Sequence, residues 1–354
     1  MKAIGRAILS AIFLILTGLM AAAAKFAPQI VFSFYPAWSR KALAALSSVS
    51  KFLPVALWEV LAVLAALWFL YTFICIFTKH RGFFSWLTGV ILALSVAVFL
   101  FVALWGLNHF APGIGETLGL DVREYSKEEL IAATNYYAAQ STSLAGTVSR
   151  DEEGRAQFAE FQTLARQSGD GYTSLQSVYP QFDGATDPVK SLLSWRLFSQ
   201  LGTTGIFICF TGESCVNQDT YEAWIPFTMC HEIAHRQAVA AEDEANFCAY
   251  LACMENPKND FRYSGAFAAY IYCNNALAKV DRSAAASIWE TVAAGVRADA
   301  NAANEHYAKY EGKVQDAAQK VNDAYLKAFD EESGVQSYGE VADLLIAWYL
   351  QKTA

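Results

Sequence analysis

Three long apolar runs fill the first third of the chain, at residues 7–24, 55–77 and 83–110. Each is long enough to cross the hydrocarbon core of a bilayer as a helix. Small residues follow the apolar centre of the first run, so it could instead be a cleaved signal peptide. Because two longer runs come later, we prefer a retained first span, and residues 1–111 are predicted to form a three-helix transmembrane region.

The chain from residue 112 onward is predicted to be a helical domain. A capping box, Ser126 with Glu129, predicts a helix that runs to about residue 149. The short apolar, β-prone stretch 205–210 predicts one strand or hairpin. The other expected helices cover residues 152–168, 188–199, 243–255, 261–279, 283–310, 313–330 and 338–351, with a break at Gly334. The fold class is therefore mainly α.

The composition agrees with a membrane part joined to a soluble part. The chain is 55% hydrophobic, which is high for a soluble protein. Residues 1–111 carry eight Lys or Arg and one acid, Glu59, whereas residues 112–354 carry 18 basic and 33 acidic residues. Because phosphates repel acidic side chains, this excess of acids in residues 112–354 argues against nucleic acid as a partner.

Counting positive charges leaves the membrane orientation tied. With the N-terminus inside, the inner side holds Lys2, Arg6, Lys79 and Arg81, and the outer side holds Lys25, Arg40, Lys41 and Lys51. Three of the outer charges fall in an amphipathic stretch, residues 37–52, that could lie along the interface. We therefore expect a multi-pass protein of the cell membrane with its N-terminus inside and residues 112–354 extracytoplasmic.

The seven cysteines show no Cys-x-x-Cys pair and do not form a disulfide framework. We expect buried free thiols on helices. One disulfide, for example Cys209 with Cys215, remains possible if the domain is extracytoplasmic.

A His-Glu-x-x-His motif at residues 231–235 carries the candidate chemistry. On a helix, His231 and His235 lie one turn apart on one face, so both imidazoles can bind one Zn²⁺. Glu232 lies beside them and can take a proton from a water that the metal activates. The motif therefore predicts a zinc site with Glu232 as general base.

The third zinc ligand is expected from the acidic cluster that follows, and Glu242 and Glu244 compete for the role. Glu242 fits the Glu-x-Glu-Ala-Asn frame of gluzincin-type peptidases, to which this segment is similar, and Asn246 would then orient a ligating histidine. On one unbroken helix Glu242 would lie about 10.5 Å beyond His235, too far to share a metal. A tight turn is therefore predicted between Gln237 and Glu242.

Two further features concern a substrate. A hydrolase needs a group that stabilises the oxyanion, and Tyr263 is the preferred candidate, with Tyr270 and Tyr272 as alternatives. The predicted strand at residues 205–210 could hold an extended peptide by backbone hydrogen bonds, or it could be a buried structural strand.

The chain resembles the bacterial family named domain of unknown function thirty-eight-ten, whose members are membrane-anchored and are regarded as zinc peptidases. The resemblance rests on the preceding spans and on these matching segments: residues 205–217, 226–235, 242–253, 261–265 and 334–339. It implies a zincin-like domain with the metal site described above. A glycine is expected after the second histidine in this family, where this chain has Ala238.

The sequence therefore predicts a membrane-anchored zinc metalloendopeptidase that acts on a peptide or protein substrate. His231, His235 and Glu242 would bind Zn²⁺, with Glu232 and Tyr263 as catalytic residues. Two alternatives stay open: a non-catalytic, metal-stabilised sensor or scaffold of the envelope, and a zinc hydrolase of a non-peptide envelope substrate. The oligomeric state is not predicted.

Overall fold

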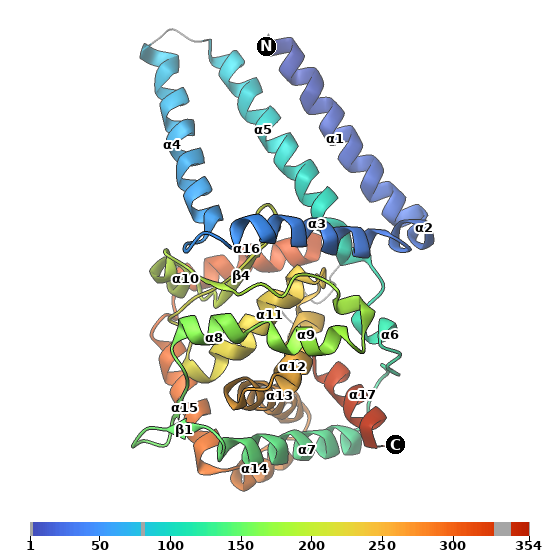
Figure 1. Ribbon diagram of the computed structural model, residues 1–354, viewed down its shortest axis with the longest axis vertical. Coiled ribbons are helices and arrows are strands. Elements are labelled where there is room, and N and C mark those ends of the chain that lie inside the picture. The colour runs from blue at the N-terminus through green and yellow to red at the C-terminus, as the bar shows by residue number, and fades with distance from the viewer. Residues whose placement is uncertain (1–2, 79–81, 329–340, 354) are drawn as a thin grey trace.

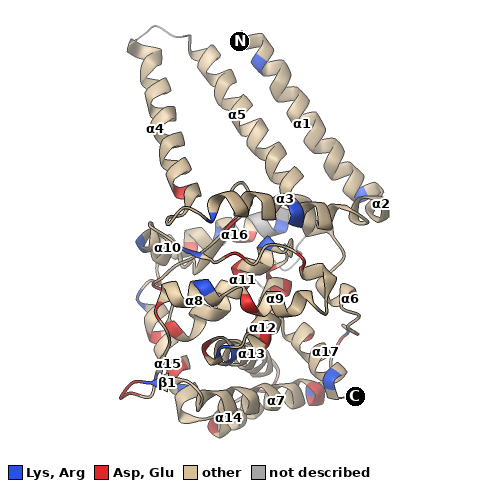
Figure 2. Cartoon of the chain, in the orientation of Figure 1, with Lys and Arg blue, Asp and Glu red and all other residues tan. Residues whose placement is uncertain are grey.

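Three long helices form one end of the molecule in the computed structural model, which describes residues 3–78, 82–328 and 341–353. They are α1 (Ala3–Phe26), α4 (Leu57–Thr78) and α5 (Phe83–Leu104), and each is long and apolar enough to cross a membrane. Charged residues gather at the ends of these helices and over the domain below them (Figure 2). The predicted transmembrane region is confirmed, and the chain is a membrane protein.

The rest of the chain forms a helical domain under the three spans (Figure 1). Its helices are α6 (Ile114–Thr117), α7 (Lys127–Ala145), α8 (Phe161–Gln167), α9 (Asp170–Gln176), α10 (Trp195–Leu201), α11 (Ile225–Arg236), α12 (Glu242–Glu255), α13 (Asn259–Val280), α14 (Arg282–Thr291), α15 (Ala294–Ala308), α16 (Lys313–Ala328) and α17 (Val341–Thr353). The predicted capping box is confirmed, because Ser126 Oγ accepts from Glu129 N at 3.1 Å and Glu129 Oε2 accepts from Ser126 N at 2.8 Å. The mainly α fold class is confirmed as well.

Helix α13 runs through the centre of this domain and contacts α7, α11, α12, α14 and α17. Its aromatic residues Phe261, Phe267 and Tyr270 are fully buried. Where α13 crosses α12 the two backbones lie close, since a Cβ at Gly265 would be 2.4 Å from Cys253 Cβ. Small residues at this crossing therefore bring α12, and with it one side of the candidate site, against the core.

Helix α3 (Tyr35–Ser50) lies across the base of the spans, after the short α2 (Pro28–Phe32) (Figure 1). Tyr35 and Ser39 donate hydrogen bonds to backbone carbonyls at the end of α5, at 3.0 and 2.6 Å. Two basic residues, Arg40 within α3 and Lys51 just after it, pair with acids of the domain, Asp183 and Asp187. Helix α3 is thus a layer between the membrane spans and the domain.

Two acidic side chains, one from each part of the chain, fix the base of α4 to the domain. Glu213 of the domain accepts hydrogen bonds from Leu57 N and Trp58 N, at 2.8 and 2.9 Å. In return, Glu59 of α4 accepts from Ser194 N at 2.9 Å. Each carboxylate satisfies backbone donors at the start of a helix, which have no partner within that helix. The two predicted regions, 1–111 and 112–354, therefore share one hydrogen-bonded structure.

A three-stranded sheet of order β3-β5-β4 lies beside α11. Strand β3 (Lys190–Ser191) runs parallel to β5 (Glu213–Val216), and β4 (Gly205–Ile208) runs antiparallel to β5. The predicted strand at residues 205–210 is thus one half of a hairpin. In the part of the chain that the structure describes, β4 is paired on one side only, so it is an edge strand.

Some predicted helices differ from the structure. The first half of the helix expected at 152–168 is wrong: β1 (Ser149–Arg150) and β2 (Ala156–Gln157) form a hairpin there. Gly154 has a φ of +77°, which a helix does not allow. The helix expected at 283–310 divides into α14 and α15, because Val292 and Ala293 are extended. Residues 188–199 form β3 and the start of α10, and Gly334 lies outside the described residues.

All seven cysteines are free and buried, as predicted, but Cys209 lies in a turn and Cys215 in β5 instead of on helices, and the two are not joined. Burial raises the pKa of the Cys209 thiol to about 12, so this cysteine is not a thiolate near neutral pH.

Candidate metal centre

Helix α11 positions the two histidines of the motif. Pro226 stands in its first turn, where a missing backbone N–H costs no hydrogen bond. His231 and His235 are one turn apart, as predicted, and their Nε2 atoms lie 3.1 Å from each other. At the end of the helix, the fully buried Arg236 donates to Ser47 Oγ of α3 at 3.1 Å. The metal-motif helix is therefore fixed against the layer under the membrane.

The predicted turn after α11 is present and has a defined form. Ala238 adopts φ +68°, in the left-handed region. Its N–H donates to His235 O at 3.0 Å, and Val239 N donates to Ala234 O at 3.1 Å. These two bonds form a Schellman motif, in which glycine is the usual residue at the left-handed position. Here an alanine stands at this left-handed position, at a cost in backbone strain.

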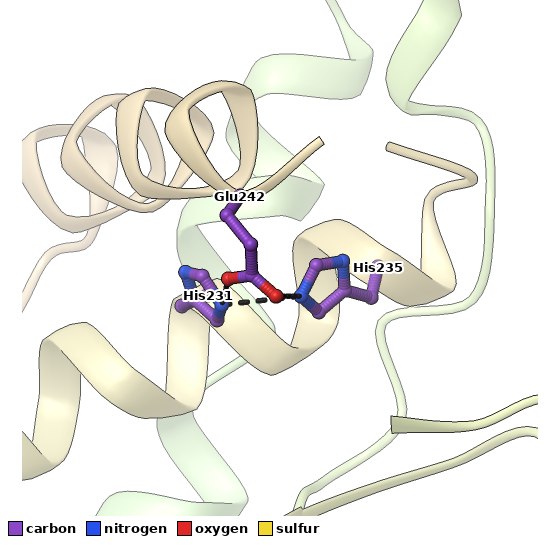
Figure 3. A group of neighbouring side chains, drawn as sticks. All are labelled: His231, His235 and Glu242. Atoms are coloured by element: carbon purple, nitrogen blue, oxygen red, sulfur yellow. Dashed lines mark hydrogen bonds and ion pairs between the residues drawn. The ribbon is translucent and has the colours of Figure 1, made fainter. Parts of the chain in front are cut away.

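The turn brings Glu242, the first residue of α12, back over the two histidines (Figure 3). Glu242 Oε2 lies 3.2 Å from His231 Nε2, and Glu242 Oε1 lies 3.8 Å from His235 Nε2. The three residues offer ligand atoms that all lie within 4.8 Å of one another. Tetrahedral zinc with ligands at about 2.0–2.1 Å separates each pair of donor atoms by about 3.3–3.4 Å. The spacing of these donors therefore fits a zinc ion.

The other nitrogen of each imidazole faces an oxygen. His231 Nδ1 lies 3.0 Å from Asn246 Oδ1, and His235 Nδ1 lies 2.8 Å from Val239 O. Because both partners are acceptors, each Nδ1 carries a proton, and the Nε2 of each neutral imidazole then has its lone pair available for a metal. Tyr272 also donates to Asn246 Oδ1, at 3.2 Å. Asn246 thus stands where the sequence predicts it, beside one histidine.

Glu244, the reserve ligand, points elsewhere. Its Oε1 accepts a hydrogen bond from Ile114 N, at the start of α6, at 2.7 Å. This contact ties α12 to the segment that follows the third span. Of the two acids that compete in the sequence, only Glu242 is brought to the histidines.

The charges of the cluster are set by burial and by close contact. Burial lowers the pKa of His235 to about 4, which keeps this imidazole neutral. Burial raises the pKa of Glu242, but its contacts with the two histidines outweigh this effect and hold the pKa at about 2. For His231, burial lowers the pKa, yet the contact with Glu242 turns the net shift upward. An anionic Glu242 between two imidazoles suits a divalent cation.

Glu232 lies in the same cavity and is 4% exposed. Burial raises the pKa of its carboxyl to about 8. Its Oε2 is buried and has no hydrogen-bond partner among the described residues. Gly205 of β4 provides the space for it, because a Cβ there would be 2.3 Å from Glu232 Oε1. A buried, unpartnered carboxyl is costly to fold, which makes a chemical role the better explanation.

A cavity of about 1020 Å³ opens on the three donors and on Glu232. One wall is β4, and another is the end of α5 and the turn after it, with Phe101, Trp105 and His109. Ala318, Gln319 and Asn322 of α16 border it as well. Sequence reasoning missed the wall from α5, since an apolar span carries no signal for which of its ends packs on a domain.

Tyr263 is not brought to this site, and its predicted oxyanion role needs correction. Its side chain is fully buried, it is not among the residues that line the cavity, and its hydroxyl donates to Asp299 Oδ2 at 2.5 Å. The guanidinium of Arg150 lies 5.1 Å from the ring centroid. Tyr263 belongs to a buried network of the core. The tyrosines that line the cavity are Tyr272, an alternative from the sequence, and Tyr307, which was missed.

A family model matches residues 33–346, nearly the whole chain, and its description is protein of unknown function (DUF3810). The chain belongs to this family. The match confirms the resemblance seen in the sequence, while the family's description assigns no activity. No curated protein and no solved structure matches the chain.

Proposed function

We propose that this member of the family is a membrane-anchored, zinc-dependent metallopeptidase. The observation that carries the proposal is the convergence of His231 Nε2, His235 Nε2 and the Glu242 carboxylate within 4.8 Å, next to the buried Glu232. The oxygens that face both Nδ1 atoms support it, because they fix the tautomer that a metal requires.

His231, His235 and Glu242 would hold the ion. Zinc, when bound, polarises a carbonyl and makes a water nucleophilic near neutral pH. Glu232 takes the proton of the attacking water and passes it to the leaving amine, and burial, which raises the pKa of this carboxyl, helps it to hold the proton between the two transfers. Tyr272 and Tyr307 line the cavity, unlike Tyr263, and are the candidates to assist the reacting carbonyl.

Peptide is the preferred substrate because of β4. This edge strand lines the cavity next to Glu232 and is unpaired on one side within the described chain. An extended peptide can add to such an edge through backbone hydrogen bonds. These bonds position the scissile bond whatever side chains the peptide carries. A non-peptide substrate would make no use of this edge.

A purely structural zinc site is the second candidate. Structural sites close the coordination sphere with a fourth protein ligand. Among the described residues, the cluster holds three candidate ligands and borders a cavity, which supports a catalytic site over a structural one.

For the orientation, we propose that the domain lies outside the cell membrane. The ends of α1, α4 and α5 nearest the domain lie opposite the N-terminus (Figure 1). Of the four basic residues expected on the domain's side, Arg40 and Lys51 are paired with acids of the domain. Three of these four, Arg40, Lys41 and Lys51, lie on or next to α3 at the interface, whereas the basic residues of the N-terminal side stand directly beside the apolar runs in the sequence, as basic residues do on the cytoplasmic side.

The test combines metal analysis and hydrolysis on the purified full-length protein in lipid vesicles. We expect about one zinc per chain, and we expect Glu232→Gln to keep the zinc and lose hydrolysis by about 10²–10⁴-fold. Glu255→Gln, which changes an exposed acid at the end of α12, is the matched control and should behave as the parent. A parent without zinc overturns the metal site, and unchanged hydrolysis in Glu232→Gln overturns the base. Bound zinc without hydrolysis of any peptide favours the structural site.

A further inference from the structure

We propose that the site acts on polypeptide segments at the point where they leave the membrane, an inference that rests on the proposed peptidase function. The substrate class is therefore the juxtamembrane stretch of another membrane-anchored protein. Three features carry the inference: the depth of the metal site, the course of β4 and the apolar lining of the cavity.

The site lies at the depth of the lipid headgroups. Helix α5 has 22 residues, and a helix of that length extends about 33 Å, close to the roughly 30 Å of the hydrocarbon core. Its last residue, Leu104, is therefore at the hydrocarbon boundary. The next residue, Trp105, donates its indole N–H to His235 O at 3.1 Å. One side chain thus separates the end of a membrane span from a metal ligand, and the headgroup layer is about 5–8 Å thick.

Strand β4 leads from the catalytic carboxylate toward the membrane. Gly205 packs on Glu232, and the hairpin that follows β4 ends against α3, because a Cβ at Gly212 would be 2.6 Å from Leu43 O. Phe210 lies at this hairpin tip and is 44% exposed. An extended chain covers about 3.3 Å per residue, so the path from residue 210 to residue 205 is about 16 Å. A peptide paired with β4 would therefore reach Glu232 within about five residues of the level of α3.

The cavity wall between the membrane and the metal is apolar. It contains Phe101 from the last turn of α5, Phe198 and Leu201 from α10, and Ile206 and Phe207 from β4. The charged residues of the lining, by contrast, belong to the metal cluster and to Glu232. Such a wall accepts the apolar side chains that flank the end of a membrane span.

The test uses three reporter substrates with one cleavable sequence and the full-length protein in vesicles of neutral phospholipid. The first carries the sequence directly after a membrane span, the second carries it after a flexible spacer of about 20 residues, and the third has no span. We expect the first to be cut at least about tenfold faster than the third, because anchoring raises the effective concentration. We expect the cut within about five residues of the span, so that it moves into the spacer of the second substrate.

Anchoring alone would speed the cleavage of any membrane substrate, so the position of the cut is the decisive result. The inference is overturned if the second substrate is cut in the cleavable sequence instead of in its spacer, or if all three substrates are cut equally. Either result leaves the peptidase proposal standing. Release of acyl chains or headgroups without peptide cleavage overturns both. Glu232→Gln must abolish whatever cleavage is seen.

A variant pair tests the membrane-facing tip without touching the metal cluster. Phe210→Asp places a carboxylate at the exposed hairpin tip beside α3 and is expected to slow cleavage of the first substrate several-fold. Val178→Asp, which changes an apolar side chain that is 65% exposed and does not line the cavity, is the control and should not slow it. Equal effects of the two changes on the anchored substrate would contradict a role for the tip.

Discussion

The indole Nε1 of Trp105 donates a hydrogen bond to the carbonyl oxygen of His235 at 3.1 Å. The two rings also meet edge to face, with centroids 5.9 Å apart. Trp105 directly follows the third span, and His235 is the second histidine of the metal motif. The bond therefore connects the membrane part of the chain to the proposed zinc site.

Replacing this tryptophan tests the connection. Trp105→Phe keeps an aromatic ring and removes the donor, so we expect a loss of about 1–2 kcal/mol in the free energy of unfolding, together with weaker zinc binding. Thermal unfolding and zinc titration of the membrane-inserted protein measure both. Trp38→Phe changes an indole on α3 that is 45% exposed and should leave both unchanged. Equal effects at the two positions would mean that the bond has no specific role.

The two competing acids give a matched pair. Loss of a residue that hydrogen-bonds to a metal ligand typically lowers metal affinity about 10–100-fold. Because Glu242 would be a ligand itself, Glu242→Gln should lower zinc affinity by more than that. Glu244→Gln replaces the charged acceptor of Ile114 N with a neutral amide oxygen, so we expect about 1 kcal/mol less stability and an unchanged zinc content. Zinc analysis and unfolding curves of both variants decide. If Glu244→Gln lost zinc and Glu242→Gln kept it, Glu244 and not Glu242 would be the third ligand.

Ala238 should tolerate glycine with a gain in stability. Its φ of +68° strains an L-residue by about 1–2 kcal/mol, while glycine loses more chain entropy on folding, so the net gain expected for Ala238→Gly is about 0.5–1 kcal/mol. Ala139→Gly, at an exposed position within α7, should instead destabilise by about 0.5–1 kcal/mol. Opposite signs in thermal unfolding are the expected result. Destabilisation by both would argue against the left-handed turn.

Asn246 accepts from His231, one of the proposed ligands, so replacing Asn246 should weaken metal binding. Asn246→Leu removes the acceptor for His231 Nδ1, and we expect zinc affinity or hydrolysis to fall about 10–100-fold. Tyr272→Phe removes only the second donor to that amide oxygen, so its effect should be smaller. A zinc competition assay ranks the two. An effect of Tyr272→Phe larger than that of Asn246→Leu would point to a direct role for the tyrosine hydroxyl.

Local chemistry made the convergence of His231, His235 and Glu242 predictable from the sequence. The spacing of His231 and His235 fixes their common face on any helix, and the length of the step to Glu242 requires a turn. The same reasoning could not say how the turn is made, because Ala238, which stands where a glycine is expected, carries no intrinsic preference for the left-handed region. It also could not choose between Glu242 and Glu244 by geometry, since that choice depends on how α12 begins.

Features that depend on distant contacts were harder to predict. Tyr263 follows the motif on a suitable helix, but its hydroxyl is taken by Asp299, which lies 36 residues further along the chain. The hairpin at β1 and β2 replaces a helix because Asp299 also accepts from Ala156 N, at 2.7 Å. The wall formed by Phe101 and Trp105 depends on the way α5 meets the domain. None of these contacts has a signal in the local pattern of apolar and polar residues.

The hydrogen bond from Arg236 to Ser47 has a consequence for where the protein can work. A chain that has not yet inserted would lack the bonds that α3 and the residue after α5 supply, so the helix that carries the histidines would keep only its contacts within the domain, such as the one from Arg236 to Asp187 O. Zinc binding should then await membrane assembly. A newly made chain would stay latent in the compartment of its synthesis, and proteins around it would be spared until it reaches the bilayer.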